Sequence, residues 1–173
     1  RLVFAPKALG AWNLHALTQG RKLSFFVMYS SAAALLGSPG QGNYTAANAL
    51  LDALSHERVR QGLPSISIQW GPFSEVGLAA AQDNRGNRLS QRGVASWTPA
   101  EGLLTLQRLL RWPRPEVGVV RFNLRQWIEF YPAAADFPQF AELFEQSTSD
   151  RHNKEVTRIR KMLQEASPPE HLP

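Results

Sequence analysis

The 173-residue sequence contains no cysteine. A disulfide framework, a thiolate nucleophile and a zinc-thiolate site are therefore excluded. The only other strong transition-metal ligands are four scattered histidines, His15, His56, His152 and His171. Their positions do not have the spacing of a metal site, so we expect no bound metal.

Long hydrophobic runs are also missing. No segment approaches the roughly 18 apolar residues of a membrane span, and no charged-then-apolar leader of a secretory signal is present. We therefore expect a cytoplasmic setting without membrane contact. With 43% hydrophobic and 19% charged residues, the composition suits one soluble domain with a substantial core.

Charge of neither sign dominates, although 19 basic against 14 acidic residues give a net charge of +5. That balance favours acidic partners in general. Nucleic acid is not expected as a partner, because the arginines form no run and no nucleic-acid motif accompanies them. Most of the excess is interpreted as a solvated basic face.

The sequence lacks the Gly-x-Gly-x-x-Gly turn with which dinucleotide folds approach a pyrophosphate. Gly37, Gly40 and Gly42 have the reverse spacing and precede a helix instead of following a first strand. We interpret them as a tight turn, not as a phosphate cradle. Since the chain also starts without methionine, we expect an earlier stretch to carry the nucleotide fingerprint.

Helical and strand patterns alternate along the chain. Helices are predicted at 7–19, 44–61 and 98–110, and strands at 23–29, 65–70 and 116–122. The Thr98 to Glu101 segment has a capping-box pattern with proline at the first helical position. Such alternation predicts an α/β fold with a parallel sheet, the second half of a doubly wound domain. A further exposed helix is predicted at 153–165.

Three polar residues gather around the first predicted strand and the helix after it. Ser31 lies at the carboxyl end of the strand, where open α/β sheets bind ligands. Tyr44 and Asn48 are four residues apart and share one face of the helix. Taken singly, each has a plain structural interpretation as a packing, strand-end or solvent-facing residue. Their joint spacing favours a site.

These residues stand within several short motifs. They are Pro6-Lys7, Ser30-Ser31, Gly37-Ser38-Pro39-Gly40-Gln41-Gly42-Asn43-Tyr44, Ala47-Asn48-Ala49, Leu51-Asp52 and Trp70-Gly71-Pro72. Together they resemble the ketoreductase domains of modular (type I) polyketide synthases, a branch of the short-chain dehydrogenase/reductase family with a Rossmann-like fold. Most short-chain reductases have lysine four residues after the tyrosine, where this chain has Asn48. In polyketide ketoreductases the two residues exchange places, and Lys7 stands 24 residues before Ser31.

The resemblance implies a catalytic set of Lys7, Ser31, Tyr44 and Asn48, with NADPH as the cofactor. Tyr44 would donate a proton to the carbonyl oxygen, and Ser31 would hold that oxygen by a hydrogen bond. Lys7 would favour the ionised tyrosine and bind the nicotinamide ribose, while Asn48 would orient Lys7 or a proton-relay water. Lys7, Tyr44, Gly71 and Pro72 would contact the cofactor, the last two near the nicotinamide carboxamide.

By the same resemblance, residues 1–146 form the C-terminal catalytic half of a ketoreductase domain, with a lid over the substrate at about 75–96. Residues 147–173 would be a helical linker towards a carrier-protein domain. The reaction would be reduction of a β-ketoacyl thioester, held on the phosphopantetheine arm of an acyl carrier protein, by a multifunctional synthase. The missing N-terminal half of the domain would be a second partner.

Two alternatives remain open at this point. They are a noncatalytic half-domain or scaffold fragment that cannot bind cofactor alone, and a stand-alone fatty-acid-type short-chain reductase. For the ketoreductase half-domain itself, we expect the fragment alone to be inactive and to self-associate through its exposed sheet edge. Asp52 and Glu57 fall on the tyrosine helix and are expected to be surface or capping groups.

Overall fold

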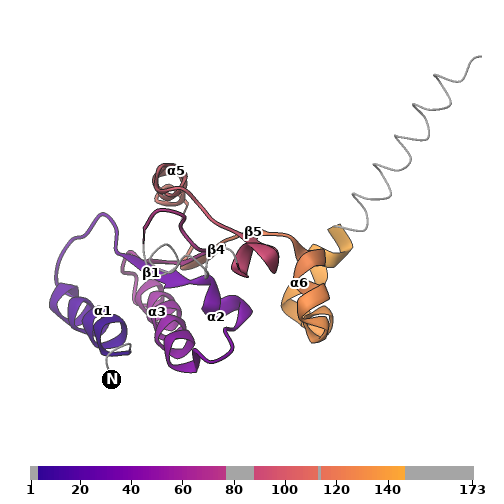
Figure 1. The fold of residues 1–173 in the computed structure, drawn as a ribbon. Helices are drawn as coiled ribbons and strands as arrows, with labels where there is room; N and C mark the ends of the chain where they lie inside the picture. The colour runs from indigo at the N-terminus through magenta and orange to yellow at the C-terminus, as the bar shows by residue number, and fades with distance from the viewer. Residues whose placement is uncertain (1–3, 77–87, 113, 147–173) are drawn as a thin grey trace, which may run out of the picture. The chain divides into compact units, whose positions relative to one another are not determined.

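The computed structural model describes residues 4–76, 88–112 and 114–146, which fall into two compact units, Arg1–Asn123 and Leu124–Pro173 (Figure 1). The first unit contains all the described strands, whereas the described elements of the second are helical. Among the described helices, none has the length and apolar character needed to cross a membrane.

A three-stranded parallel sheet forms the centre of the first unit. Its strands β1 (Val27–Ser31), β2 (Ile66–Trp70) and β4 (Glu116–Val119) lie in the order β1-β2-β4. Ser31 is opposite Trp70, which is in turn opposite Val119. The carboxyl ends of all three strands therefore lie at the same edge, and the predicted parallel α/β sheet is confirmed.

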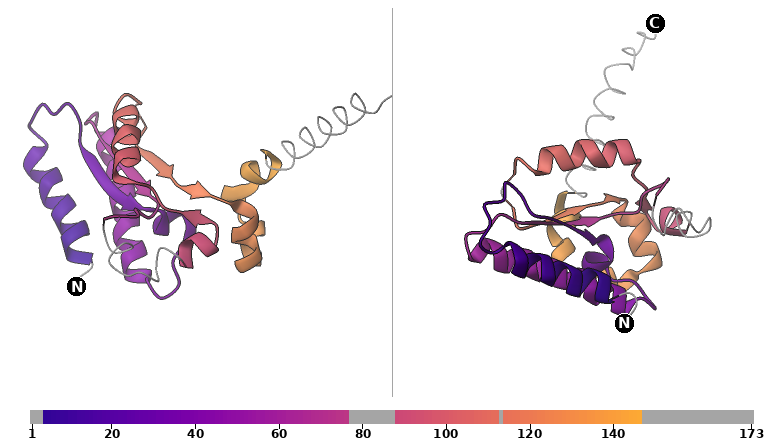
Figure 2. Two further views of the ribbon diagram at one scale, coloured as in Figure 1. Left: turned by 45° about the horizontal axis from the view of Figure 1, so that its top comes forward. Right: turned by 90° about the vertical axis from the view of Figure 1, so that its left-hand side faces the viewer.

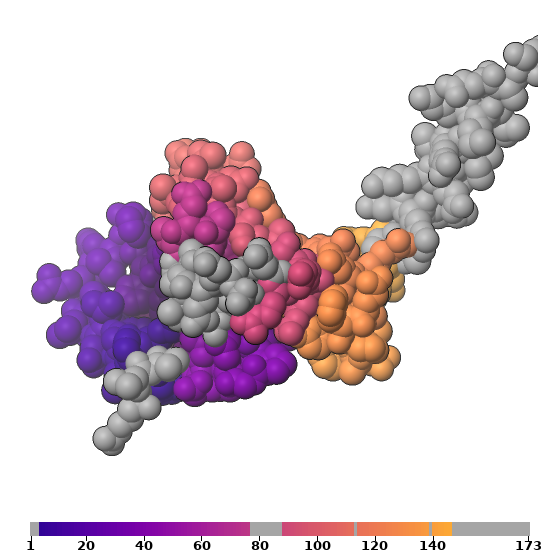
Figure 3. All heavy atoms as spheres, in the orientation of Figure 1, coloured from indigo at the N-terminus to yellow at the C-terminus, as the bar shows by residue number. Residues whose placement is uncertain are grey.

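Helices cover both faces of this sheet. Helices α1 (Phe4–Thr18) and α3 (Gly42–Arg60) lie on one face and α5 (Pro99–Leu109) on the other (Figure 2). In the space-filling view, the atoms of α1 and α3 adjoin (Figure 3). Because both faces are covered, every residue of β2 is buried.

Each face has its own apolar cluster. The first joins α1 and α3 to β1 through Ala11, Phe26, Met28, Leu51 and Leu54. The second joins α5 to the sheet through Ile66, Ile68, Trp70, Leu109 and Val119. The unit is thus a three-layer sandwich in which the sheet is the middle layer.

Local sequence accounts for the helix boundaries. Thr98 caps α5, and its hydroxyl accepts a hydrogen bond from the Glu101 backbone while the Glu101 carboxylate accepts one from the Thr98 backbone. Gly37 and Gly40 both have φ of +75°, which confirms the glycine turn ahead of α3. The short helix α2 (Ala32–Leu36) was not predicted; it starts directly after Ser31, in a run of strong helix formers.

Two strand predictions need correction. The first strand spans 27–31 instead of 23–29, because pairing with β2 begins at Val27 while Phe26 packs into the α1/α3 cluster. The predicted strand 116–122 is two strands. After Val119 the chain leaves the parallel sheet, and β5 (Arg121–Phe122) pairs antiparallel with β3 (Val94–Ala95).

The second unit contains α6 (Leu124–Phe130) and the 3₁₀ helices η1 (Pro132–Asp136) and η2 (Pro138–Phe140). Buried Trp127 lies 4.5 Å from the Tyr131 ring, centroid to centroid. Residues 77–87 of the predicted lid and the whole predicted linker 147–173, with its helix 153–165, lie outside the described residues.

Candidate active site

Ser31 occupies the end of β1, at the carboxyl edge of the sheet. Its Oγ accepts a hydrogen bond from the Ala33 backbone N–H at 3.2 Å and so caps α2. Trp70, the strand partner of Ser31, is followed directly by Gly71. Ser31 and the Gly71-Pro72 segment therefore share this edge of the sheet.

Lys7, Asn48 and Tyr44 form a connected cluster. The Lys7 Nζ donates to Asn48 Oδ1 at 2.7 Å, and the Asn48 Nδ2 donates to the Tyr44 carbonyl at 2.8 Å. Lys7 Nζ lies 5.5 Å from the centre of the Tyr44 ring. Asn48 is fully buried, whereas Lys7 and Tyr44 are half-buried. Packing of α1 against α3 thus brings together residues from separate parts of the sequence.

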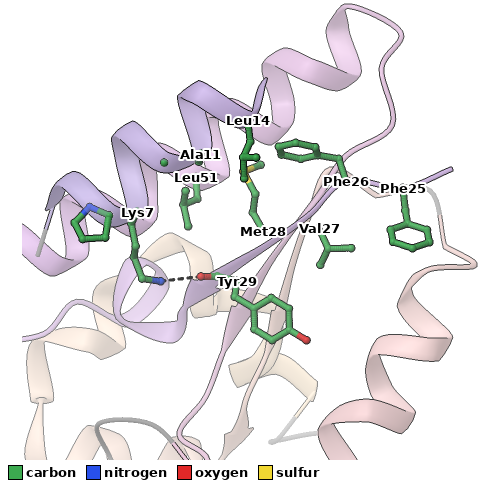
Figure 4. Close-up of a pocket in the computed structure, with 11 residues that line it drawn as sticks. Lys7, Ala11, Leu14, Phe25, Phe26, Val27, Met28, Tyr29 and Leu51 are labelled. Carbon is green, nitrogen blue, oxygen red and sulfur yellow. Dashed lines mark hydrogen bonds between the residues drawn. The ribbon is translucent and has the colours of Figure 1, made fainter. Parts of the chain in front are cut away.

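A carbonyl of β1 fixes the lysine from the other side. The Phe26 carbonyl accepts from Ile66 of β2, so by strand alternation the Tyr29 carbonyl faces away from β2. Lys7 Nζ donates to this outward carbonyl at 2.7 Å (Figure 4). Two of the three ammonium hydrogens of Lys7 are therefore committed to fixed acceptors, and one remains for a ligand.

Burial lowers the pKa of Lys7 below its ordinary value of 10.5, while the charges of Tyr44 and Asp52 act in the opposite direction. A cation within about 6 Å of the face of a phenol ring is attracted to it. The Lys7 ammonium and the Tyr44 ring are therefore within range of a direct cation–π contact.

Asp52 is not a surface or capping group, so that prediction is wrong. It is 6% exposed, and its carboxylate accepts hydrogen bonds from Ser67 Oγ at 2.6 Å and Gln69 Nε2 at 2.9 Å. The sequence did contain a signal for this burial. Asp52 follows Asn48 by four residues, which places both side chains on the same face of the helix. Glu57 lies on the opposite, exposed face and pairs with Arg60.

The Gly71-Pro72 segment is closely packed. The Gly71 N–H donates to the Val119 carbonyl at 2.9 Å, and the Pro72 carbonyl accepts from Trp97 at 2.8 Å. A Cβ on Gly71 would lie 3.4 Å from both Trp97 Nε1 and the Val119 oxygen. Among the described residues, the buried Trp97 Nε1–H has no hydrogen-bond partner, and it lies beside the glycine. A carboxamide oxygen is the kind of group that this donor fits.

An apolar groove of about 470 Å³ runs between α1 and β1 (Figure 4). Leu14 and Met28 line it, Phe25 stands at its far side, and Lys7 lies at its polar end. Within residues 4–76, 88–112 and 114–146, β1 has no strand partner on this side. The same ranges contain no group of His, Asp or Glu side chains that could hold a metal.

A parallel sheet with a serine at the end of β1, and a tyrosine in the first turn of α3 in contact with a lysine, is the arrangement of the short-chain reductases. Comparison with known proteins narrows the class further, since residues 1–75 match the KR domain family. Residues 1–75 therefore belong to the KR domain family, and the chain is similar to the ketoreductases of polyketide synthases.

Relatives and solved structures agree on this assignment. The chain is 41% identical over 143 residues to a phenolphthiocerol/phthiocerol polyketide synthase of Mycobacterium tuberculosis, covering 83% of this chain and 6% of the relative. It is 40% identical over 154 residues to a phthioceranic/hydroxyphthioceranic acid synthase of the same species, covering 87% of this chain and 7% of the relative.

Among solved structures, an A-type ketoreductase from a modular polyketide synthase superposes with a TM-score of 0.71 at 35% identity, covering 75% of this chain and 27% of that one. The first ketoreductase of the tylosin synthase superposes with a TM-score of 0.68 at 34% identity, covering 75% and 28%. The chain therefore spans only a small part of the proteins it resembles.

Proposed function

We propose that this chain provides the proton-donating half of an NADPH-dependent β-ketoacyl reductase. Its substrate would be a β-keto thioester carried by an acyl carrier protein, and its product the β-hydroxy thioester. The observation that carries the proposal is the Lys7–Asn48–Tyr44 cluster next to the sheet edge that Ser31 and Gly71 share.

Each residue of the cluster has a role in ketone reduction. Negative charge develops on the carbonyl oxygen as the ketone is reduced, and the site must neutralise it. The Ser31 hydroxyl donates a hydrogen bond to that oxygen, and the Tyr44 hydroxyl transfers its proton there. Lys7 stabilises the phenolate that remains, and Asn48 keeps Lys7 in place. NADPH, when bound, supplies the hydride to the carbonyl carbon.

The residues present fit one end of the cofactor. The third N–H of Lys7 suits a ribose hydroxyl, and the buried Trp97 N–H beside Gly71 suits the nicotinamide carboxamide. For the pyrophosphate, the sequence provides no glycine-rich turn after a strand. We therefore assign phosphate binding to an N-terminal half of the same domain.

The edge of β1 is the place where such a half would join. Beyond the apolar groove, the outer side of α1 exposes Leu9 by 57%, Trp12 by 55% and Leu17 by 73%. Exposed apolar surface next to an unpaired strand edge favours association. Residues 1–173 alone would therefore self-associate. They would not turn over substrate, because they provide no glycine-rich turn for the pyrophosphate.

Replacing Tyr44 by phenylalanine tests the proposal, in the complete reductase domain that includes this chain. We expect Tyr44→Phe to lower kcat for a β-keto thioester by about 10²- to 10⁴-fold, the range for general acid catalysis, with little change in NADPH affinity. Retention of more than about a tenth of the parent kcat would show that the proton comes from elsewhere.

The noncatalytic alternative is favoured by one feature, the absence of a glycine-rich phosphate turn from the sequence. Calorimetry of residues 1–173 distinguishes a half-domain from a self-sufficient reductase. Micromolar NADPH binding by a monodisperse monomer would exclude the half-domain assignment. Asn48, at the position where most short-chain reductases have lysine, argues against a stand-alone fatty-acid-type enzyme.

A further inference from the structure

A buried carboxylate lies one helical turn beyond the proposed catalytic cluster. Asp52 follows Asn48 by four residues on α3, and its side chain faces β2. Both oxygens accept hydrogen bonds from neutral groups, the Ser67 hydroxyl and the Gln69 amide. Among the described residues it makes no direct ion pair. Burial of a charge in this way is unfavourable unless another charge compensates it.

The charged and titratable groups around Asp52 come from three elements. Gln69 Nε2 also donates to Glu116 Oε1 of β4 at 2.8 Å, and the other Glu116 oxygen lies 2.9 Å from His56 Nε2 of α3. His56 and Glu116 are 55% and 33% exposed, so water screens them. Tyr44 lies on α3 itself, and Lys7 approaches from α1.

Lys7 is the cation whose charge interacts with that of Asp52. Its ammonium is held by Asn48, the residue one helical turn before Asp52 on α3. The carboxylate in turn binds Ser67 and Gln69, which attaches this turn of α3 to the middle strand of the sheet. Its position is therefore fixed by the core, independently of any ligand.

We infer that Asp52 is a positioning residue of the reductase site, which acts through Lys7. Its negative charge keeps the partly buried ammonium protonated. This inference rests on the proposed function. Removal of the charge should make Lys7 lose its proton at lower pH, because burial already opposes the ammonium form.

The pH dependence of catalysis tests the inference in the complete domain. For Asp52→Asn we expect the alkaline limb of the kcat profile to move to lower pH, so that the ratio of kcat at high pH to kcat at neutral pH falls roughly threefold or more below that of the parent. Ser67→Ala is the matched control, since it removes one hydrogen bond from the same carboxylate and leaves the charge. Glu116→Gln removes the second, exposed carboxylate. Both controls should keep the profile of the parent.

A measurement without turnover separates this inference from the proposed function. NMR of lysine labelled at Cε follows the titration of Lys7 directly, and its midpoint should be lower in Asp52→Asn than in the parent. Equal midpoints in the two proteins, or an equal change in Ser67→Ala, would overturn the inference even if the parent is an active reductase. Where asparagine prevents folding, Asp52→Ser gives the same comparison with a smaller neutral side chain. Inactivity of the parent would instead count against the proposed function.

Discussion

Replacement of Asn48 by alanine should reduce activity through Lys7. The alanine removes the Oδ1 atom that accepts from Lys7 Nζ at 2.7 Å, in a place without solvent exposure. A hydrogen bond to a charged group is worth about 1.5–3 kcal/mol. If that energy holds Lys7 in its working position, kcat/KM should fall by about 10- to 150-fold.

The effect should divide between two measurable steps. Lys7 keeps its bond to the Tyr29 carbonyl, so it remains near the site but becomes free to rotate about that anchor. We therefore expect weaker NADPH binding in fluorescence titrations together with a lower single-turnover rate of thioester reduction. Asn48→Ala also releases the Tyr44 carbonyl, so thermal unfolding must be measured to show that the variant is folded at the assay temperature.

Asn43 provides the matched control. It lies in the first turn of the same helix, is exposed, and its Oδ1 accepts from the Tyr44 backbone N–H at 2.8 Å, yet it has no contact with Lys7. Asn43→Ala should stay within about threefold of the parent kcat/KM, since an exposed neutral hydrogen bond contributes about 0.5 kcal/mol, the lower end of the usual range. If Asn48→Ala keeps half of the parent activity, or if both variants lose the same amount, the assigned role of Asn48 is wrong.

Three further predictions concern stability. Arg58→Met should destabilise the fold by about 2–4 kcal/mol in chemical denaturation, because it removes a fully buried guanidinium with its hydrogen bonds and its aromatic contact; an unchanged midpoint would contradict this. Gly102→Ala should cost about 1–3 kcal/mol, because its Cβ would come within 2.5 Å of the Phe73 ring, and a crystal structure with an unmoved ring would refute the packing argument. The pKa of Glu101 is lowered to about 2, first by the backbone N–H of Thr98, so its contribution to α5 is present above its ordinary value of 4.5 and is lost as pH falls from there to about 2. Amide exchange in α5 should accelerate over that interval in the parent and show no such pH dependence in Glu101→Gln.

Much of the fold was predictable because its signals are local. The capping box at Thr98 defines the start of α5, and the glycine turn with φ of +75° at Gly37 and Gly40 precedes α3. The alternation of helices and strands determined the parallel sheet. The limits of β1 were misjudged because the pairing that sets them, Val27 with Ile66, joins residues far apart in the sequence.

Of the candidate site, too, only the part that depends on local sequence could be predicted. Helical spacing alone places Tyr44 and Asn48 together. The position of Lys7 followed only from the family resemblance, because its contacts with Asn48 and the Tyr29 carbonyl depend on how α1 packs. Asp52 was missed because a charged residue on a helix is usually solvated. Ser67 and Gln69, polar residues at alternate positions of a strand, were in fact its partners.

The cap that Ser31 forms on α2 has a consequence for recognition. One lone pair of its oxygen is already engaged by the Ala33 N–H, whereas the O–H and the second lone pair are not used by that bond. A carbonyl oxygen can therefore accept from the O–H without disturbing the cap. A ligand that donates to the engaged lone pair would instead compete with the first turn of α2, so the cap removes one of the two places where a donor could bind and leaves the place for an acceptor intact.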